Sequence, residues 1–229
     1  MSQPFQEGDA LLIVDPQVDF CPGGSLAVPH GDRIFEAVNR DVPFNGLRWF
    51  FDHAETVAEP DLERIKALGG GIAIQDRMAF QGEYFIDRYG ADAAGRTPPI
   101  TKMLATGLPV GAGTDATRVA SYNPWVSLYW MVAGKTVGGT ALYPEANRLD
   151  RTEALRRYTV GSAWFSGEED KKGSVEAGKL ADLAVLSADY FSVSGVGLPP
   201  KYHTCQGDFQ QADSRPLAGA CQRRRGLPS

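Results

Sequence analysis

The sequence predicts an α/β fold built on a parallel sheet, and three observations carry that prediction. Apolar runs without alternation, at residues 10–14, 47–51 and 71–75, are typical of strands buried on both faces. Helix-like segments separate these runs along the chain. Polar residues follow the runs directly, which is the pattern expected where the carboxyl ends of parallel strands form a site.

Local sequence features indicate where the predicted strands and helices begin and end. Pro16 stops the first strand because it cannot donate to a sheet. Pro60 suits the first turn of a helix, and the glycines at 69–71 close it. We expect strands at 10–14, 47–51, 71–75, 108–114 and 183–186, and helices starting at 33 and spanning 59–68, 80–89, 98–106, 124–132 and 152–166.

Composition excludes several classes of protein. The 229 residues carry a net charge of -5, so no basic surface for nucleic acid is expected. No apolar run approaches the roughly 20 residues that span a bilayer, and the first residues lack a signal-peptide pattern. We therefore expect a cytoplasmic protein that acts on a small molecule, without a nucleic-acid or membrane partner.

His53 and Asp115 are the strongest pair of candidate functional residues. Each follows a predicted buried strand. A hydrolytic metal site needs imidazole and carboxylate ligands and an open position for water. A carboxylate beside the metal can also accept the proton of that water. The alternative is a hydrogen-bonded histidine and a helix-capping aspartate without a catalytic role.

Asp15 is a second candidate, because it ends the first predicted strand. A carboxylate there can act as a general base or orient a nucleophile, or it can simply form the turn before Pro16. Cys21 is a candidate nucleophile, although no base lies near it in the sequence.

Residues 8–32, GDALLIVDPQVDFCPGGSLAVPHGD, resemble the start of nicotinamidases in the isochorismatase-like hydrolase family. The resemblance implies that Asp15 belongs to an Asp-Lys-Cys triad and that Phe20 lines the nicotinamide pocket. The lysine, the nucleophilic cysteine and the metal motif of that family do not follow in this chain.

Residues 35–193 resemble the carboxyl-terminal part of the amidohydrolase superfamily, in its family-3 branch. The segments that carry this resemblance are RWFFDHAE, LERIKALGGGIAIQ, LPVGAGTDA and GSVEAGKLADLAVLS. It implies a TIM barrel with a small β-sandwich, one or two divalent metals, usually zinc, and hydrolysis of non-peptide C–N bonds such as amides. His53 then matches a metal ligand, and Asp115 matches a metal ligand and general base.

The other metal ligands of that superfamily have no counterpart here, and Asp76 stands where relatives favour histidine and is a possible third ligand. We therefore expect a partial TIM-like barrel of three to four strands with a remnant of the β-sandwich, whose open edges favour self-association.

The expected parts are a nicotinamidase-like fragment at 1–34, the partial barrel at 35–166, the sandwich return at 167–193 and an unrelated, disordered tail at 194–229. The leading hypothesis is a truncated, metal-dependent amidohydrolase with weak or no activity. A nicotinamidase-like hydrolase and a non-catalytic chimeric chain remain as alternatives.

Overall fold

The computed structural model describes residues 40–41, 43–44, 46–116, 120–186 and 188–192, together with the backbone of residues 202–205. The chain divides into two units, residues 1–47 and 48–229, and every element below belongs to the second. The strand expected at 10–14, the helix expected to start at 33 and the boundary expected after residue 34 lie outside the described residues.

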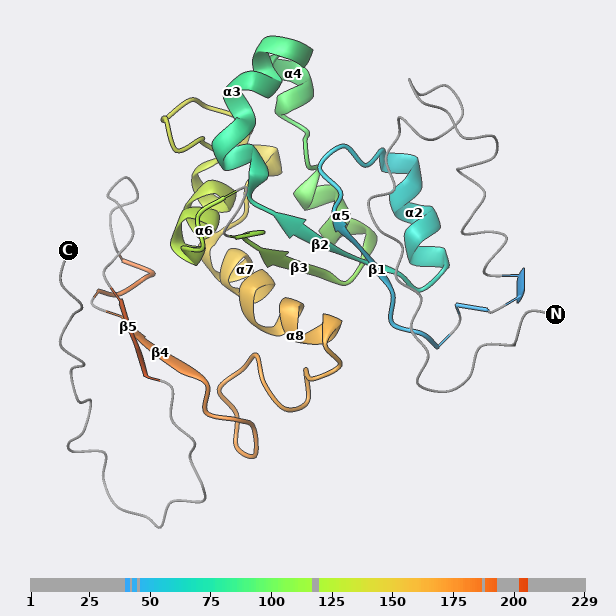
Figure 1. Ribbon diagram of the computed structural model, residues 1–229, viewed down its shortest axis with the longest axis vertical. Coiled ribbons are helices and arrows are strands. Elements are labelled where there is room, and N and C mark those ends of the chain that lie inside the picture. The colour runs from blue at the N-terminus through green and yellow to red at the C-terminus, as the bar shows by residue number, and fades with distance from the viewer. Residues whose placement is uncertain are drawn as a thin grey trace. The chain divides into compact units, whose positions relative to one another are not determined.

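A three-stranded parallel sheet forms the centre of the second unit (Figure 1). Strand β2 (Gly71–Gln75) lies between β1 (Phe50–His53) and β3 (Val110–Gly113), and both of its neighbours run parallel to it. The register pairs His53 with Ile74, and Gln75 with Gly113. The parallel sheet predicted from the apolar runs is therefore present, and all three strands end at one edge.

Helices connect and cover these strands. Their bounds are α2 (Glu59–Ala67), α3 (Arg77–Tyr89), α4 (Ala91–Ala94), α5 (Ile100–Thr106), α6 (Pro124–Ala133), α7 (Arg151–Arg156) and α8 (Ser162–Phe165). A 3-10 turn spans Glu145–Asn147, and a π-helical turn spans Arg157–Gly161 between α7 and α8.

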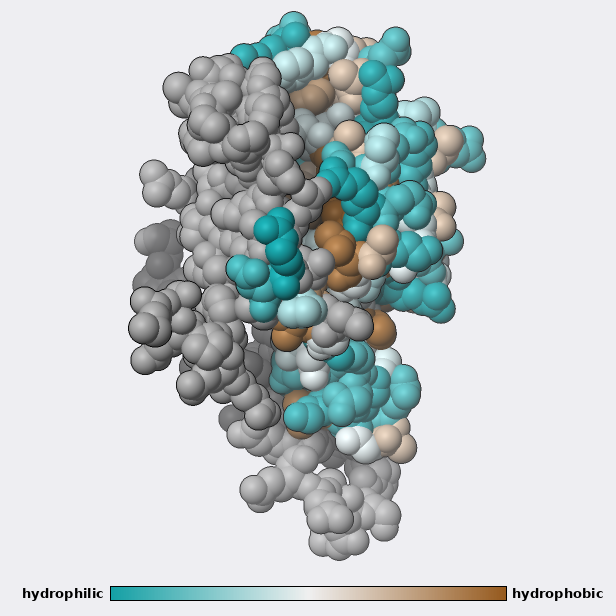
Figure 2. Space-filling model, turned by 90° about the vertical axis from the view of Figure 1, so that its right-hand side faces the viewer, coloured by the Kyte–Doolittle hydropathy of each residue, from teal (hydrophilic) through white to brown (hydrophobic). Residues whose placement is uncertain are grey.

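The apolar core lies against the isoleucine face of β2. Ile72 and Ile74 are fully buried, as is Ile100 of α5. Helix α2 packs beside α5 and buries Leu62 and Ile65, while its charged residues face outward. Figure 2, which faces the side of Figure 1 where α2 lies, shows described atoms that are mainly hydrophilic with small apolar areas between them.

The opposite face of the sheet is covered by α8. Successive residues of a strand point to opposite faces. A side chain at position 111 would therefore point to the face opposite that of Val110. A Cβ built on Gly111 would lie 2.5 Å from the ring of Phe165, which means that only glycine permits this approach. Helices thus cover both faces of an open sheet, whereas in a closed barrel one face lines the interior.

The outer edge of β3 is also covered. Arg157 donates a hydrogen bond to the carbonyl oxygen of Val110 (3.1 Å), and the hydroxyl of Ser162 donates to the carbonyl oxygen of Ala112 (3.0 Å). Unpaired edge groups invite pairing with another chain, and here side chains occupy them. Self-association through open sheet edges stays a prediction.

Several predicted boundaries move for identifiable reasons. The strand expected at 47–51 is observed at 50–53. Trp49, just before it, donates its indole N–H to the carbonyl oxygen of Leu68 (2.9 Å). The helix expected at 98–106 begins at Ile100, since a residue before proline disfavours the helical conformation and Pro98 precedes Pro99. The helix expected at 152–166 contains the π-helical turn.

A second, two-stranded sheet pairs β4 (Leu183–Leu186) with β5 (Tyr202–Cys205) in antiparallel register. Strand β4 matches its predicted bounds. Strand β5 lies within 194–229, the segment expected to be a disordered tail, so four of its residues are ordered as a strand. The rest of that segment and the predicted domain boundaries stay predictions. Within the described residues, no helix is long and apolar enough to cross a membrane.

Candidate active site

The carboxyl edge of the parallel sheet brings together the candidate residues that the structure describes. His53 is the last residue of β1, Asp76 directly follows β2, and Asp115 lies two residues beyond β3. The sequence predicts this placement for His53 and Asp115, because each follows an apolar run. Asp15 and Phe20, the candidates implied by the nicotinamidase resemblance, lie outside the described residues.

Two carboxylates approach the same imidazole nitrogen. His53 Nδ1 lies 3.7 Å from Asp115 Oδ2 and 3.7 Å from Glu55 Oε1. Both distances exceed that of a hydrogen bond. The imidazole thus lies beside two carboxylates, and its Nδ1 is hydrogen-bonded to neither.

The backbone that holds these side chains is strained. His53, Ala54 and Asp115 have φ angles of 72°, 53° and 49°, in the left-handed region that non-glycine residues rarely adopt. They are the only non-glycine residues with positive φ in the described part of the chain. Strain of this kind costs roughly 1–3 kcal/mol per residue and clusters at functional sites. Its position at one sheet edge supports a functional role for that edge.

Glu55 is a site residue that the sequence reasoning missed. The two left-handed residues before it reverse the chain and return its carboxylate to His53, and its side chain is mostly buried. The only signal in the sequence was a carboxylate two residues after a histidine at a strand end. That carboxylate reaches His53 only because the backbone reverses direction between them, which the sequence does not show.

Asp76 is completely buried, and neither of its carboxylate oxygens has a hydrogen-bond partner among the described residues. Burial, with a smaller contribution from the nearby charge of Asp115, raises the pKa of Asp76 to about 7. Burial also raises the pKa of Tyr158, to which the charge of Asp76 contributes. Asp76 therefore lies near both Asp115 and the buried phenol of Tyr158.

Buried polar atoms without hydrogen bonds gather at this edge. Within the described residues, those at this edge are His53 Nδ1, Glu55 Oε1, Gln75 Oε1, Asp76 Oδ1, Asp76 Oδ2 and Arg77 Nε, and others belong to Ser127, Trp130 and Tyr158 elsewhere in the fold. A buried polar group without a partner costs about 1–3 kcal/mol. A set of such atoms at one edge is the arrangement expected where a polar ligand or an ion binds.

The residue types fit a divalent cation, but the described donors form only part of a ligand set. An imidazole nitrogen and a carboxylate oxygen are the ligands that zinc takes, and His53 Nδ1 lacks a partner. In the described part of the chain, however, no three His, Cys, Asp or Glu side chains are grouped closely enough to hold an ion. The observed arrangement supplies His53 and Asp115 and lacks a third ligand.

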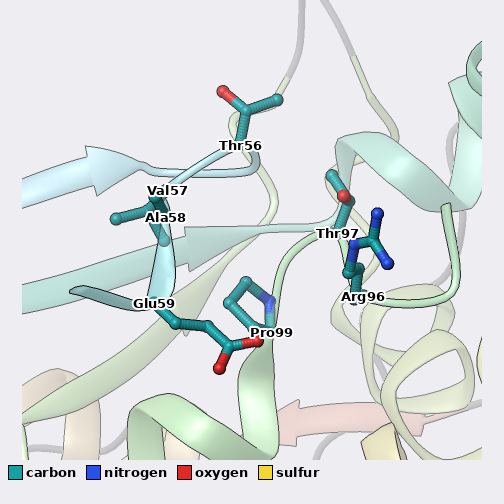
Figure 3. A pocket seen from close by; sticks show the side chains of 7 residues that line it. All are labelled: Thr56, Val57, Ala58, Glu59, Arg96, Thr97 and Pro99. Carbon is teal, nitrogen blue, oxygen red and sulfur yellow. The ribbon is translucent and has the colours of Figure 1, made fainter. Parts of the chain in front are cut away.

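A cavity of about 240 Å³ adjoins the loop that carries His53 and Glu55. Figure 3 shows Thr56, Val57, Ala58 and Glu59 on one side of it and Arg96, Thr97 and Pro99 on the other. None of the candidate residues described above lines it.

The sequence profile of the Amidohydrolase family matches residues 24–195, which is most of the chain. The chain belongs to the amidohydrolase family. The match begins within the stretch that resembles nicotinamidase, so the two resemblances overlap between residues 24 and 32.

Individual relatives of this amidohydrolase chain cover parts of it. The N-substituted formamide deformylase of Arthrobacter pascens is 37% identical over 91 residues, which is 40% of this chain and 16% of the deformylase. The nicotinamidase of Escherichia coli (strain K12) is 61% identical over 31 residues, 14% of this chain and 15% of that enzyme.

A crystal structure supports the fold of the amidohydrolase chain. An uncharacterized metal-dependent hydrolase of Pyrococcus furiosus is 29% identical, covers 62% of this chain and 28% of its own, and superposes with a TM-score of 0.52. The chain spans less than a third of the length of each of these three relatives.

Proposed function

We propose that this amidohydrolase chain is a metal-dependent hydrolase of C–N bonds other than peptide bonds, acting on small amides. The observation that carries the proposal is the approach of His53 Nδ1 to Asp115 Oδ2, at 3.7 Å, across a sheet whose middle strand separates them. Family membership and the likeness to a metal-dependent hydrolase support it.

His53 and Asp115 would hold the divalent cation, which we propose to be zinc. A cation bound there polarises the carbonyl of the substrate and makes water more acidic. Asp115 is the general base that accepts the proton of the attacking water. His53, fixed by its strained turn, presents its Nδ1 beside that carboxylate.

We expect the chain alone to bind the cation weakly and to hydrolyse amides slowly or not at all. Structural and catalytic zinc sites use three or four protein ligands, and the observed arrangement supplies two. Loss of a single member of a catalytic unit can lower the rate by several orders of magnitude.

The test is turnover of N-formyl amines and N-acyl amides with zinc added, for the natural sequence and for His53→Ala. We expect a low rate that His53→Ala abolishes. A high rate that is unchanged in His53→Ala would contradict both the site and the expected weak activity.

We also propose that residues 8–34 are a nicotinamidase-like fragment joined to the amidohydrolase part, which makes the chain a chimera. The high identity of the short match to nicotinamidase supports this. A fragment without the lysine and cysteine of the triad should not hydrolyse nicotinamide. Turnover of nicotinamide that Asp15→Ala abolishes would contradict that expectation.

A further inference from the structure

An arginine lines the cavity that adjoins the loop of His53 and Glu55 (Figure 3). Among the described residues, no salt bridge or hydrogen bond involves the guanidinium of this residue, Arg96. The other charged residue of the lining, Glu59, is paired with Lys102. Since the two charges of that pair cancel, the positive charge of Arg96 is left uncompensated at the cavity and favours an anionic group.

Buried side chains fix the backbone on both sides of Arg96. The buried amide of Asn147 donates a hydrogen bond to the carbonyl oxygen of Gly95 (3.2 Å), which precedes Arg96. The buried phenol of Tyr143 donates to the carbonyl oxygen of Thr97 (2.9 Å), which follows it. A wall that is already ordered loses little conformational freedom when a ligand binds, so this cavity wall is preorganised for binding.

Glu55 connects the cavity with the candidate site. Its carboxylate lies 3.7 Å from His53 Nδ1. Burial raises the pKa of the Tyr143 phenol, and the nearby charge of Glu55 contributes to the rise. The same phenol holds the carbonyl oxygen of Thr97, and Thr56, the residue after Glu55, lines the cavity. Glu55 thus acts on a group of the candidate site and on a group that holds the cavity wall, which places the two within reach of one small molecule.

We propose that this cavity binds a carboxylate group of the substrate through Arg96, so that the substrate is an amide that also carries an acidic group. The inference rests on the function proposed above and names the substrate class of the same site. A guanidinium and a carboxylate form charge-assisted hydrogen bonds, often in pairs. The cavity of about 240 Å³ has room for a short aliphatic acid, and Val57 and Pro99 provide apolar surface for its carbon chain.

The alternative is that Arg96 is a solvated surface arginine without a ligand. Two probes of the same size separate these roles: succinamate carries an amide and a carboxylate, and succinamide carries two amides and no charge. The experiment is a ligand-observed NMR titration of the metal-free full chain with each probe, for the natural sequence, Arg96→Gln and the control Arg88→Gln. Arg88 is exposed on α3 and does not line the cavity.

We expect the natural sequence and Arg88→Gln to bind succinamate at least about 10-fold more tightly than succinamide, because a hydrogen bond to a charged group corresponds to a factor of about 10 or more. Arg96→Gln should bind the two probes equally weakly and, since Arg96 is exposed, should melt at the temperature of the natural sequence. Equal binding of the two probes by the natural sequence, or an unchanged preference in Arg96→Gln, overturns the inference.

A second variant tests the cavity without changing its charge. Ala58→Phe places a ring in the cavity lining, whereas Ala91→Phe places the same ring at the exposed start of α4, outside the cavity. We expect Ala58→Phe alone to abolish the preference for succinamate, and a preference that survives in Ala58→Phe contradicts the proposed location.

The probe titrations need no metal, so they separate this inference from the proposed hydrolysis. A preference for succinamate that depends on Arg96, in a chain without zinc-dependent turnover, supports the carboxylate site and overturns the hydrolase function. Zinc-dependent turnover of amides without such a preference supports the hydrolase function and overturns the carboxylate site.

Discussion

The interior of the parallel sheet and its carboxyl edge differ in how completely their polar groups are hydrogen-bonded. In its interior, Ile72, Ile74 and Val110 are buried among apolar side chains. At the carboxyl edge, a few residues further along the same strands, the backbone is strained and buried polar atoms lack partners. The contrast teaches that stability is concentrated in the strand interiors and that the edge is held in a costly arrangement suited to binding.

The largest expected effect is a difference in stability between a variant in the interior of the sheet and a variant at its carboxyl edge. Ile74→Ala should lower the free energy of unfolding by about 2–5 kcal/mol, because it leaves a cavity in a closely packed core. His53→Ala should change it by less than about 1 kcal/mol, since its side chain is 37% exposed and not hydrogen-bonded through Nδ1. Denaturant unfolding measures both variants, and similar losses in the two would remove the distinction.

The next effect concerns the pH dependence of stability in the metal-free chain. The pKa of Asp76 is about 7 when folded and 3.8 ordinarily. Between these values the folded state retains a proton that the unfolded state has lost, so the contribution of Asp76 to stability falls as the pH rises from about 4 to 7. Urea unfolding across that range should show a smaller fall for Asp76→Asn, and an identical pH dependence would contradict the burial of an acid.

A smaller effect is expected at the outer edge of β3. Arg157→Ala removes the hydrogen bond to the Val110 carbonyl oxygen and the ion pair with Glu153. Loss of a partner from a shielded carbonyl costs about 1–3 kcal/mol. Thermal unfolding gives that loss, and light scattering should show more self-association through the exposed edge. Arg156→Ala, whose charge contacts the same glutamate from a more exposed position, is the matched control.

The smallest effect belongs to the start of α6. The side chain of Asn123 accepts a hydrogen bond from the backbone nitrogen of Trp125 and caps that helix. Asn123→Ala should lower the free energy of unfolding by about 1 kcal/mol, and Asn123→Asp should keep the cap. Because α6 belongs to the packed region, neither variant should change zinc binding, and a change in binding would show that the two regions are coupled.

Much of the fold is readable from the sequence because the signals are local. The glycines and the polar residues that flank 71–75 define β2 at its observed bounds. The π-helical turn at Arg157–Gly161 could not be read in this way. Gly161 lies so close to β3 that an added Cβ would be 2.5 Å from the carbonyl oxygen of Val110. The turn depends on that tertiary contact, which the helical pattern of the segment does not contain.

The candidate site could be predicted only in part, because some of its features also depend on tertiary structure. The sequence indicates His53 and Asp115, since both follow apolar runs that end at one sheet edge. It does not show that Glu55 returns to His53, because that depends on two consecutive left-handed residues. Nor does it show how deeply Asp76 is buried, which results from packing around the end of β2.

The most direct test of the account is the amount of zinc that the purified chain binds at equilibrium, measured by dialysis followed by elemental analysis. The account predicts weak binding of zinc by the natural sequence, and loss of that binding in His53→Ala and in Asp115→Asn. Equal zinc in the natural sequence and in both variants would contradict the claim that the carboxyl edge of the parallel sheet is the metal site.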